Sequence, residues 1–106
     1  MQNYPVRPSH RANLTPENLE RIARNHFTEV TSSEGLVTAK YGALDRLAAK
    51  AAGRELSIEV AMNPKVAIEV AQETIRRYNR FLEETTGYST KERARRLKKA
   101  VTGAAD

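Results

Sequence analysis

Lysine and arginine side chains are concentrated near the end of this 106-residue chain. Residues 89–106 contain six Lys or Arg against two acids, whereas residues 1–88 contain twelve against eleven. The six cations fall within nine residues and are Lys91, Arg93, Arg95, Arg96, Lys98 and Lys99. A dense basic segment attracts polyanions, because each phosphate that it neutralises releases a counterion. The chemistry that this pattern predicts is contact with phosphate groups, without reading of bases.

Helical spacing would give this basic segment two faces. Ala94, Leu97 and Val101 would form a narrow apolar stripe that docks on the domain. Another face would carry four of the cations, namely Lys91, Arg95, Lys98 and Lys99. The same composition also fits a solvated helix whose cations only complement its C-terminal dipole.

Two arginines that precede this segment, Arg76 and Arg80, could extend the basic surface because they lie one helical turn apart. Nearby acids offer a plainer explanation for this group. Glu73 and Arg77 have the spacing of a favourable i, i+4 pair, and the glutamates of residues 83–84 are close enough to neutralise the remaining charge. Local salt bridges are therefore the competing interpretation of these arginines.

Other chemistry finds little support in the sequence. The two histidines, His10 and His26, are far apart, and the chain has no cysteine to complete a metal site with them. His26 has the spacing of a buried position on a helix. The chain contains no nucleophile elbow, Walker pattern or Gly-rich phosphate loop. Glu59 comes nearest to a tuned carboxylate, but strand alternation places it on the exposed face. We expect no catalytic residue, metal ion, cofactor or small-molecule substrate.

Length and composition indicate one domain spanning residues 1–106, with residues 102–106 frayed. The core must be built mainly from Leu, Ile, Val and Ala, because the chain has no Trp and only two Phe. No apolar run is long enough to cross a bilayer, and residues 1–10 lack the apolar part of a signal peptide. We therefore expect a cytoplasmic protein without a membrane partner.

The first half of the chain predicts a strand, a helix and a hairpin. Two prolines among residues 1–11 restrict any strand there to a sheet edge. Thr15 followed by Pro16 predicts the start of a helix, whose apolar residues through Phe27 share one face. Residues 28–31 and 36–41 are rich in β-branched residues around a turn-like segment, which predicts two strands joined by a hairpin.

Residues 43–52 are ambiguous from the sequence alone. Their alanine-rich composition and leucine spacing favour a helix, but Gly53 could instead form a tight hairpin turn into the next segment. That next segment, residues 54–62, alternates with Leu56, Ile58, Val60 and Met62 on one face, as in a half-buried strand.

Two helices are predicted to complete the chain. Asn63 and Pro64 resemble the cap and first residue of a long helix that would end at Gly87. The apolar stripe of that helix includes Tyr78 and Phe81, which we expect in the core, whereas Tyr41 and Tyr88 are candidates for exposed aromatics. Ser89-Thr90-Lys91-Glu92 has the pattern of a capping box, so a last helix should begin near Thr90 and continue through Lys99.

The stretch ETIRRYNRFLEETTGY at residues 73–88, followed by STKERARRLKK at residues 89–99, resembles the C-terminal signature of a small uncharacterised archaeal family, a domain of unknown function. The resemblance extends through residues 40–44 and 62–64. It implies a β-α-β-β-β-β-α-α order with residues 44–52 as a strand, similar in topology to one half of the TATA-box-binding saddle. It implies no activity, and the likeness to that saddle is no evidence of DNA binding.

These observations together predict an α+β domain in which an antiparallel meander sheet packs on two main helices, followed by a short basic helix. The leading interpretation of its function is a non-enzymatic binding domain that contacts nucleic-acid phosphates. The alternative is a protein-interaction or homodimeric scaffold that uses the exposed sheet face or the long helix, with the basic tail serving solubility.

Overall fold

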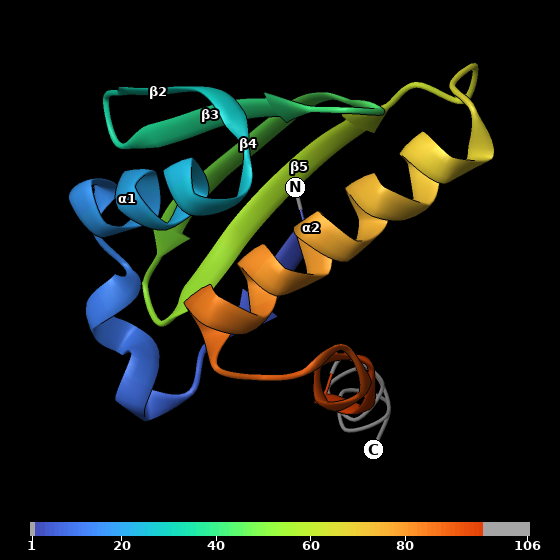
Figure 1. Cartoon of the computed structure of the whole chain (residues 1–106). Coiled ribbons are helices and arrows are strands. Elements are labelled where there is room, and N and C mark those ends of the chain that lie inside the picture. Colours follow the sequence, from blue (N-terminus) through green and yellow to red (C-terminus); the bar gives the residue numbers. More distant parts are fainter. Residues whose placement is uncertain (1, 97–106) are drawn as a thin grey trace.

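The computed structural model describes residues 2–96 of the chain, which form an α+β fold (Figure 1). Four helical segments accompany a five-stranded sheet. In chain order, the elements are β1 (Gln2–Pro5), the 3₁₀ helix η1 (Pro8–Asn13), α1 (Pro16–His26), β2 (Thr28–Ser33), β3 (Leu36–Tyr41), β4 (Leu44–Ala52), β5 (Glu55–Met62) and α2 (Ile68–Thr86). Residues 90–96 form a further helical segment. The predicted α+β class is confirmed.

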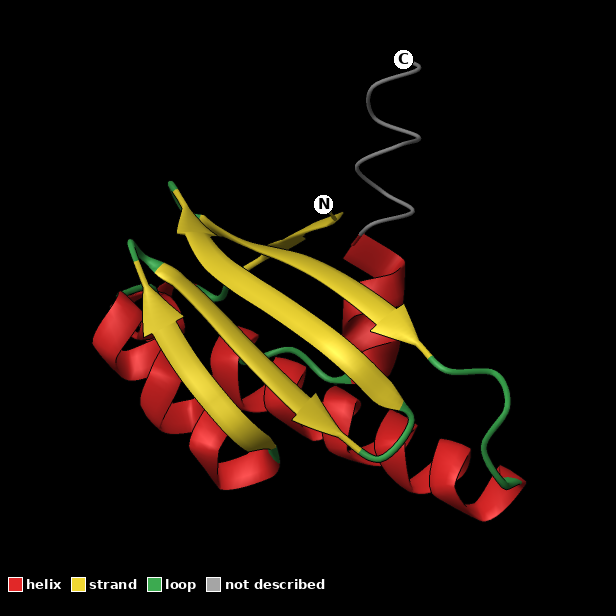
Figure 2. Cartoon of the chain, turned by 90° about the horizontal axis from the view of Figure 1, so that it is seen from above, coloured by secondary structure: helices red, strands yellow, loops and turns green. Residues whose placement is uncertain are grey.

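The sheet is antiparallel throughout, with the strand order β1-β5-β4-β3-β2. Strands β2 to β5 are a meander, and β1 adds to its far side beside β5, at the sheet edge that its prolines predict. Seen from above, the helices lie beneath one face of the sheet and leave the other face uncovered (Figure 2). The domain therefore has two layers, and its core lies between them.

Helix α1 begins as its sequence predicts. The Thr15 side chain accepts a hydrogen bond from the Asn18 backbone N–H at 3.2 Å, and Pro16 occupies the first turn. Leu19, Ile22 and Ala23 are buried on the face that the spacing indicates. His26 is mostly buried at the end of this helix, with 13% of its side chain exposed.

The predicted hairpin joins β2 and β3. Glu34 and Gly35 both have positive φ values, 51° and 81°, and they connect the paired residues Ser33 and Leu36. Two residues of this kind are typical of a type I′ turn, whose twist matches that of the strands.

The ambiguous segment is strand β4, as the family resemblance implies. It pairs with β3 on one side and with β5 on the other, so it lies at the centre of the sheet. Leu47 and Ala49 are fully buried there. Hydrogen bonds on both edges and burial against the helices override the helix propensity of the alanines.

The predicted start of the long helix is wrong by several residues, because α2 begins at Ile68 and not at Pro64. Asn63 uses its side chain to accept a hydrogen bond from the Lys65 backbone N–H at 2.9 Å, which closes a turn. Its own backbone N–H donates to the Ala43 carbonyl at 2.7 Å. Asn63 therefore belongs to a loop tied to the β3–β4 turn.

The other end of α2 agrees with the prediction. Gly87 ends the helix with φ of 79°, and its backbone N–H donates to the Glu83 carbonyl. Phe81 is fully buried and contacts Phe27 with 5.2 Å between ring centroids, and Tyr78 packs against the same core. Across residues 2–96, none of the helices has the length and apolar character required to cross a membrane.

Two features of the fold escaped the sequence patterns. The 3₁₀ helix η1 was not predicted, because its residues, PSHRAN, show no apolar periodicity and none of them is buried. The alternating face of β5 is buried only in part. Leu56 and Ile58 lie in the core, whereas Val60 and Met62 are 40% and 42% exposed. Glu59 is exposed, as the alternation predicts.

Candidate nucleic-acid interface

The basic segment begins with the predicted capping box. The Ser89 backbone N–H donates to the Glu92 carboxylate and the Glu92 backbone N–H donates to the Ser89 hydroxyl, each at 3.2 Å. The hydrogen bonds from Ser89 hold the pKa of the Glu92 carboxyl below its ordinary value, and the nearby Arg7 guanidinium acts in the same direction. Residues 90–96 are thus helical from the predicted residue onward.

Arg93 is not a surface cation, which corrects the prediction that it faces a polyanion. Only 3% of the residue is exposed. Its guanidinium donates to the Tyr88 carbonyl at 2.6 Å, to the Asn79 side chain at 3.2 Å and to the Thr90 hydroxyl at 3.1 Å. Burial lowers the pKa of this guanidinium, but an arginine retains its charge at neutral pH. Arg93 therefore fastens the basic segment to α2.

The expected docking stripe is also wrong where the structure describes it. Ala94 is exposed, while Leu97 and Val101 lie outside the described residues. The segment packs through Arg93 because polar groups on α2 and on the loop after α2 bind this side chain. The spacing of apolar residues does not reveal such polar contacts.

Tyr88 is buried and not an exposed aromatic as predicted, with 5% of the residue accessible. Two arginines lie over its ring. The guanidinium carbon of Arg7 is 4.6 Å from the ring centroid and that of Arg96 is 4.3 Å away. Arg7 also donates to the Gly87 carbonyl and to the Glu92 carboxylate. Cation–π contacts and an ion pair thus join the chain before η1 to the basic segment. Tyr41, the other candidate, is half-buried.

Lys91 and Arg95 are exposed on the side of the helical segment that faces away from Arg93. Each is two residues from Arg93, which places it about 160° around the helix from that anchor. Within residues 2–96, neither side chain forms an ion pair. Arg96 is also exposed, although it contacts Tyr88. The structure thus brings three of the predicted cations to the surface of one helical turn and a half.

The two candidates on α2 differ from each other. Arg76 forms an ion pair with Glu73 at 3.1 Å, and Arg77 binds the same carboxylate at 3.2 Å, which confirms the predicted local pairing. These two arginines lower the pKa of Glu73, mainly through the hydrogen bond from Arg77. Arg80 is exposed and has no ion pair with any described residue. Lys98 and Lys99 lie outside the described residues.

The expected neutralisation of Arg80 by the glutamates of residues 83–84 does not occur within the described part of the chain. The Glu84 carboxylate instead contacts the His26 ring, with 3.2 Å between Oε1 and Nε2. This contact joins α2 to the end of α1, two elements that the sequence alone cannot place side by side.

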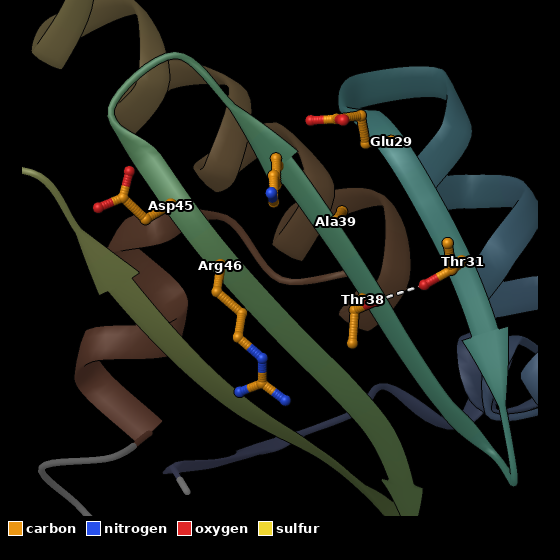
Figure 3. A pocket seen from close by; sticks show the side chains of 7 residues that line it. Glu29, Thr31, Thr38, Ala39, Asp45 and Arg46 are labelled. Carbon is orange, nitrogen blue, oxygen red and sulfur yellow. Dashed lines mark hydrogen bonds between the residues drawn. The ribbon is translucent and has the colours of Figure 1, made fainter.

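A shallow groove lies elsewhere, over strands β2 to β4, and has a volume of about 310 Å³. Glu29 on β2 and Asp45 on β4 stand on either side of β3 (Figure 3). The other lining residues are Thr31, Thr38, Ala39, Lys40 and Arg46. The groove combines two acids with two cations and contains no aromatic ring. It therefore offers neither a strong potential of one sign nor a platform on which bases stack.

No cluster of three or more histidine, cysteine or acidic side chains suited to a metal ion occurs within the described residues. Among the described residues, the predicted cations that are exposed and form no ion pair are Lys91, Arg95, Arg96 and Arg80, whereas Arg76 is exposed but paired with Glu73.

Comparison with known proteins gives a similar solved structure and a family for this chain. A solved structure, the hypothetical protein TA0095 from Thermoplasma acidophilum, is similar with a TM-score of 0.68 and 28% identity. The match covers 92% of this chain and 97% of that one. No curated protein matches the chain. The family model for the domain of unknown function DUF5611 matches residues 1–99. Since that match covers nearly the whole chain, this protein belongs to the DUF5611 family.

Proposed function

We propose that this domain is a non-enzymatic module that binds the phosphate backbone of nucleic acid through its C-terminal basic segment. One observation carries the proposal. Burial of Arg93 against α2 directs Lys91 and Arg95 away from the domain, and neither pairs with a carboxylate among the described residues.

The anchoring gives this basic segment an advantage over a flexible basic tail. A helical segment that is already docked loses little conformational entropy when a polyanion binds to it. Lys91 and Arg95 are one turn apart on the same face, so they can contact neighbouring phosphates together. Arg96 follows Arg95 and adds a further exposed cation, and Arg80 adds another on α2.

The interface has no exposed aromatic ring to stack on bases, because Tyr88 is buried beneath two arginines. Contacts of this kind are electrostatic and carry little sequence information. We therefore expect similar affinity for nucleic acids of different sequence, and a strong dependence of that affinity on salt.

The experiment is a titration of fluorescently labelled DNA and RNA duplexes with the protein, followed by anisotropy at several salt concentrations. The variant Lys91→Glu/Arg95→Glu reverses two charges on the proposed interface. Its matched control, Lys50→Glu/Arg54→Glu, reverses one exposed lysine and one exposed arginine at the β4–β5 hairpin. Both variants change the net charge equally, so a general effect of charge would alter both alike.

Under the proposal, the interface variant binds about 10- to 30-fold more weakly near physiological salt, and the slope of log affinity against log salt decreases by about two. The hairpin variant binds nearly as well as the natural sequence. The proposal is wrong if the natural sequence does not bind at low salt, or if the two variants lose affinity equally.

A further inference from the structure

Exposed large hydrophobic side chains gather in one part of the described structure. They all lie between residues 60 and 75, at the end of β5 and in the first two turns of α2. They are Val60, Met62, Ile68, Val70 and Ile75, with exposed fractions between 40% and 67%. Figure 1 shows why the two elements meet here, since α2 runs back along β5 after the loop that joins them. Val70 lies on another side of α2 from Ile68 and Ile75, so these two isoleucines form the exposed apolar stripe of the helix, and such a stripe marks an interaction site.

The edge of β5 is open at the same place. Strand β1 pairs only with residues Glu55 to Ile58, and β4 occupies the other edge along the whole strand. Among the described residues, the outer backbone groups from Glu59 to Met62 therefore have no strand partner. An open edge beside exposed apolar side chains favours association with another chain.

The exposed flank of α2 has the pattern of a helix that packs on a copy of itself. Ile68 and Ile75 are seven residues apart and lie on one side of the helix, with Ala71 and Gln72 between them. An antiparallel copy centred between Ala71 and Gln72 would place Ile68 of each helix against Ile75 of the other. The stripe is therefore self-complementary, as a two-fold interface requires.

The charged residues beside this stripe are also self-complementary. Glu69 and Arg76 are also seven residues apart and lie on a single flank. A two-fold axis brings the same flank of both helices together in opposite directions. Glu69 of each copy then lies on the same side of the pair as Arg76 of the other, whereas a parallel two-fold pair would place these flanks on opposite sides. Arg76 is accessible for this role, because 64% of its side chain is exposed even while it contacts Glu73.

We infer that this chain forms a two-fold homodimer through α2, with the helices antiparallel and Ile68, Ile75, Glu69 and Arg76 at the interface. The partner is a second copy of the chain. In an antiparallel pair, the apolar stripe of one helix meets the same stripe of the other, and opposite charges lie on the same side. The surface does not include Lys91 or Arg95, so dimerisation is independent of the proposed nucleic-acid binding.

Sedimentation equilibrium of the purified chain without nucleic acid tests the inference. The natural sequence should be dimeric at high concentration. Ile68→Glu should be monomeric there, while its helix remains intact because an acid suits the first turn of α2. Circular dichroism checks the fold of each variant. A natural chain that stays monomeric, or an Ile68→Glu variant that is still dimeric, would overturn the inference.

Charge exchange tests the antiparallel geometry. Glu69→Arg and Arg76→Glu should each weaken the dimer, and the double variant should restore it, because the opposite charges meet again. The same exchange at exposed positions of α1, Glu17→Arg/Arg21→Glu, should have no effect on association. A double variant that is no better than the single variants would contradict the antiparallel pairing.

A cysteine near the two-fold axis gives an independent measure. The chain has no cysteine of its own, so Gln72→Cys introduces a single thiol. In the proposed dimer, two such thiols approach each other and should form a disulfide under mild oxidation. Arg21→Cys, on exposed α1, should remain mostly uncrosslinked at the same concentration. Equal crosslinking of both variants would point to random collision and count against the interface.

Discussion

Arg93 shows how one side chain can decide the role of its neighbours. A buried guanidinium that forms no ion pair is costly unless its N–H groups find acceptors. Here two side-chain oxygens and the Tyr88 carbonyl accept them. Nη1 binds the Tyr88 carbonyl while Nη2 binds Asn79 and Thr90, and a single ammonium nitrogen cannot take both places. The charge of Arg93 is thus buried, whereas the charges of Lys91 and Arg95, two residues before and after it, are exposed to solvent.

This reasoning predicts that Arg93→Lys destabilises the protein although the charge is conserved. A lysine ammonium cannot reach all three acceptors, so at least one buried acceptor is left unpaired. We expect a loss of about 1–3 kcal/mol in the free energy of unfolding, measured by urea denaturation. The matched control is Arg95→Lys at an exposed position, which should change stability by less than about 0.5 kcal/mol. Equal effects of the two substitutions would show that Arg93 does not anchor the segment.

At the scale of elements, the position of α2 depends on a close approach to the β3–β4 turn. Thr74 is fully buried, and its hydroxyl accepts a hydrogen bond from the Ala43 backbone N–H at 2.9 Å while donating to the Val70 carbonyl at 2.7 Å. Gly42 permits this approach, because a Cβ atom there would lie only 2.4 Å from the Thr74 hydroxyl oxygen. Helix and turn are therefore in direct contact at a glycine.

We predict that Gly42→Ala destabilises the protein more than Gly53→Ala does. Both glycines have positive φ, 51° and 65°, so an alanine at either position costs about 1 kcal/mol in backbone strain. At Gly53 the added methyl group meets nothing within 4 Å, whereas at Gly42 it displaces Thr74. Thermal or chemical unfolding should show about 1–3 kcal/mol of additional loss for Gly42→Ala. Similar losses for both variants would mean that α2 can move away from the turn at little cost.

At the scale of the whole molecule, one core unites the helices and the sheet. Phe81 of α2 is fully buried and contacts Phe27, which follows α1, while residues from all five strands belong to the same cluster. A domain with a single core should lose its secondary and tertiary structure in one cooperative transition.

The variant Phe81→Ala tests whether the domain unfolds in a single cooperative transition. Removing the ring should lower the free energy of unfolding by about 3–5 kcal/mol, because it leaves a cavity where helix and sheet meet. Unfolding followed by far-ultraviolet circular dichroism and by tyrosine fluorescence should still give one midpoint. Val70→Ala, on the partly exposed flank of the same helix, should cost less than about 1 kcal/mol. Separate midpoints for the two signals would indicate more than one folding unit.

The sequence by itself determined those features that depend on a few neighbouring residues. The cap at Thr15, the turn at Glu34 and Gly35, the stop at Gly87 and the capping box at Ser89 each involve contacts within about one turn of chain. The i, i+4 pair of Glu73 and Arg77 belongs to the same class. Local geometry is enough to predict them, because the partners are always close.

Only the tertiary structure decided the features whose partners lie far along the chain. Strand β4 forms because two other strands flank it, and α2 starts late because Asn63 bonds to Ala43. The sequence predicts Arg93 and Tyr88 at the surface, but both are buried. Arg93 binds an acceptor on α2, and Arg7, near the N-terminus, lies over the Tyr88 ring. Burial depends on which elements pack together, and a short-range pattern carries no information about that choice.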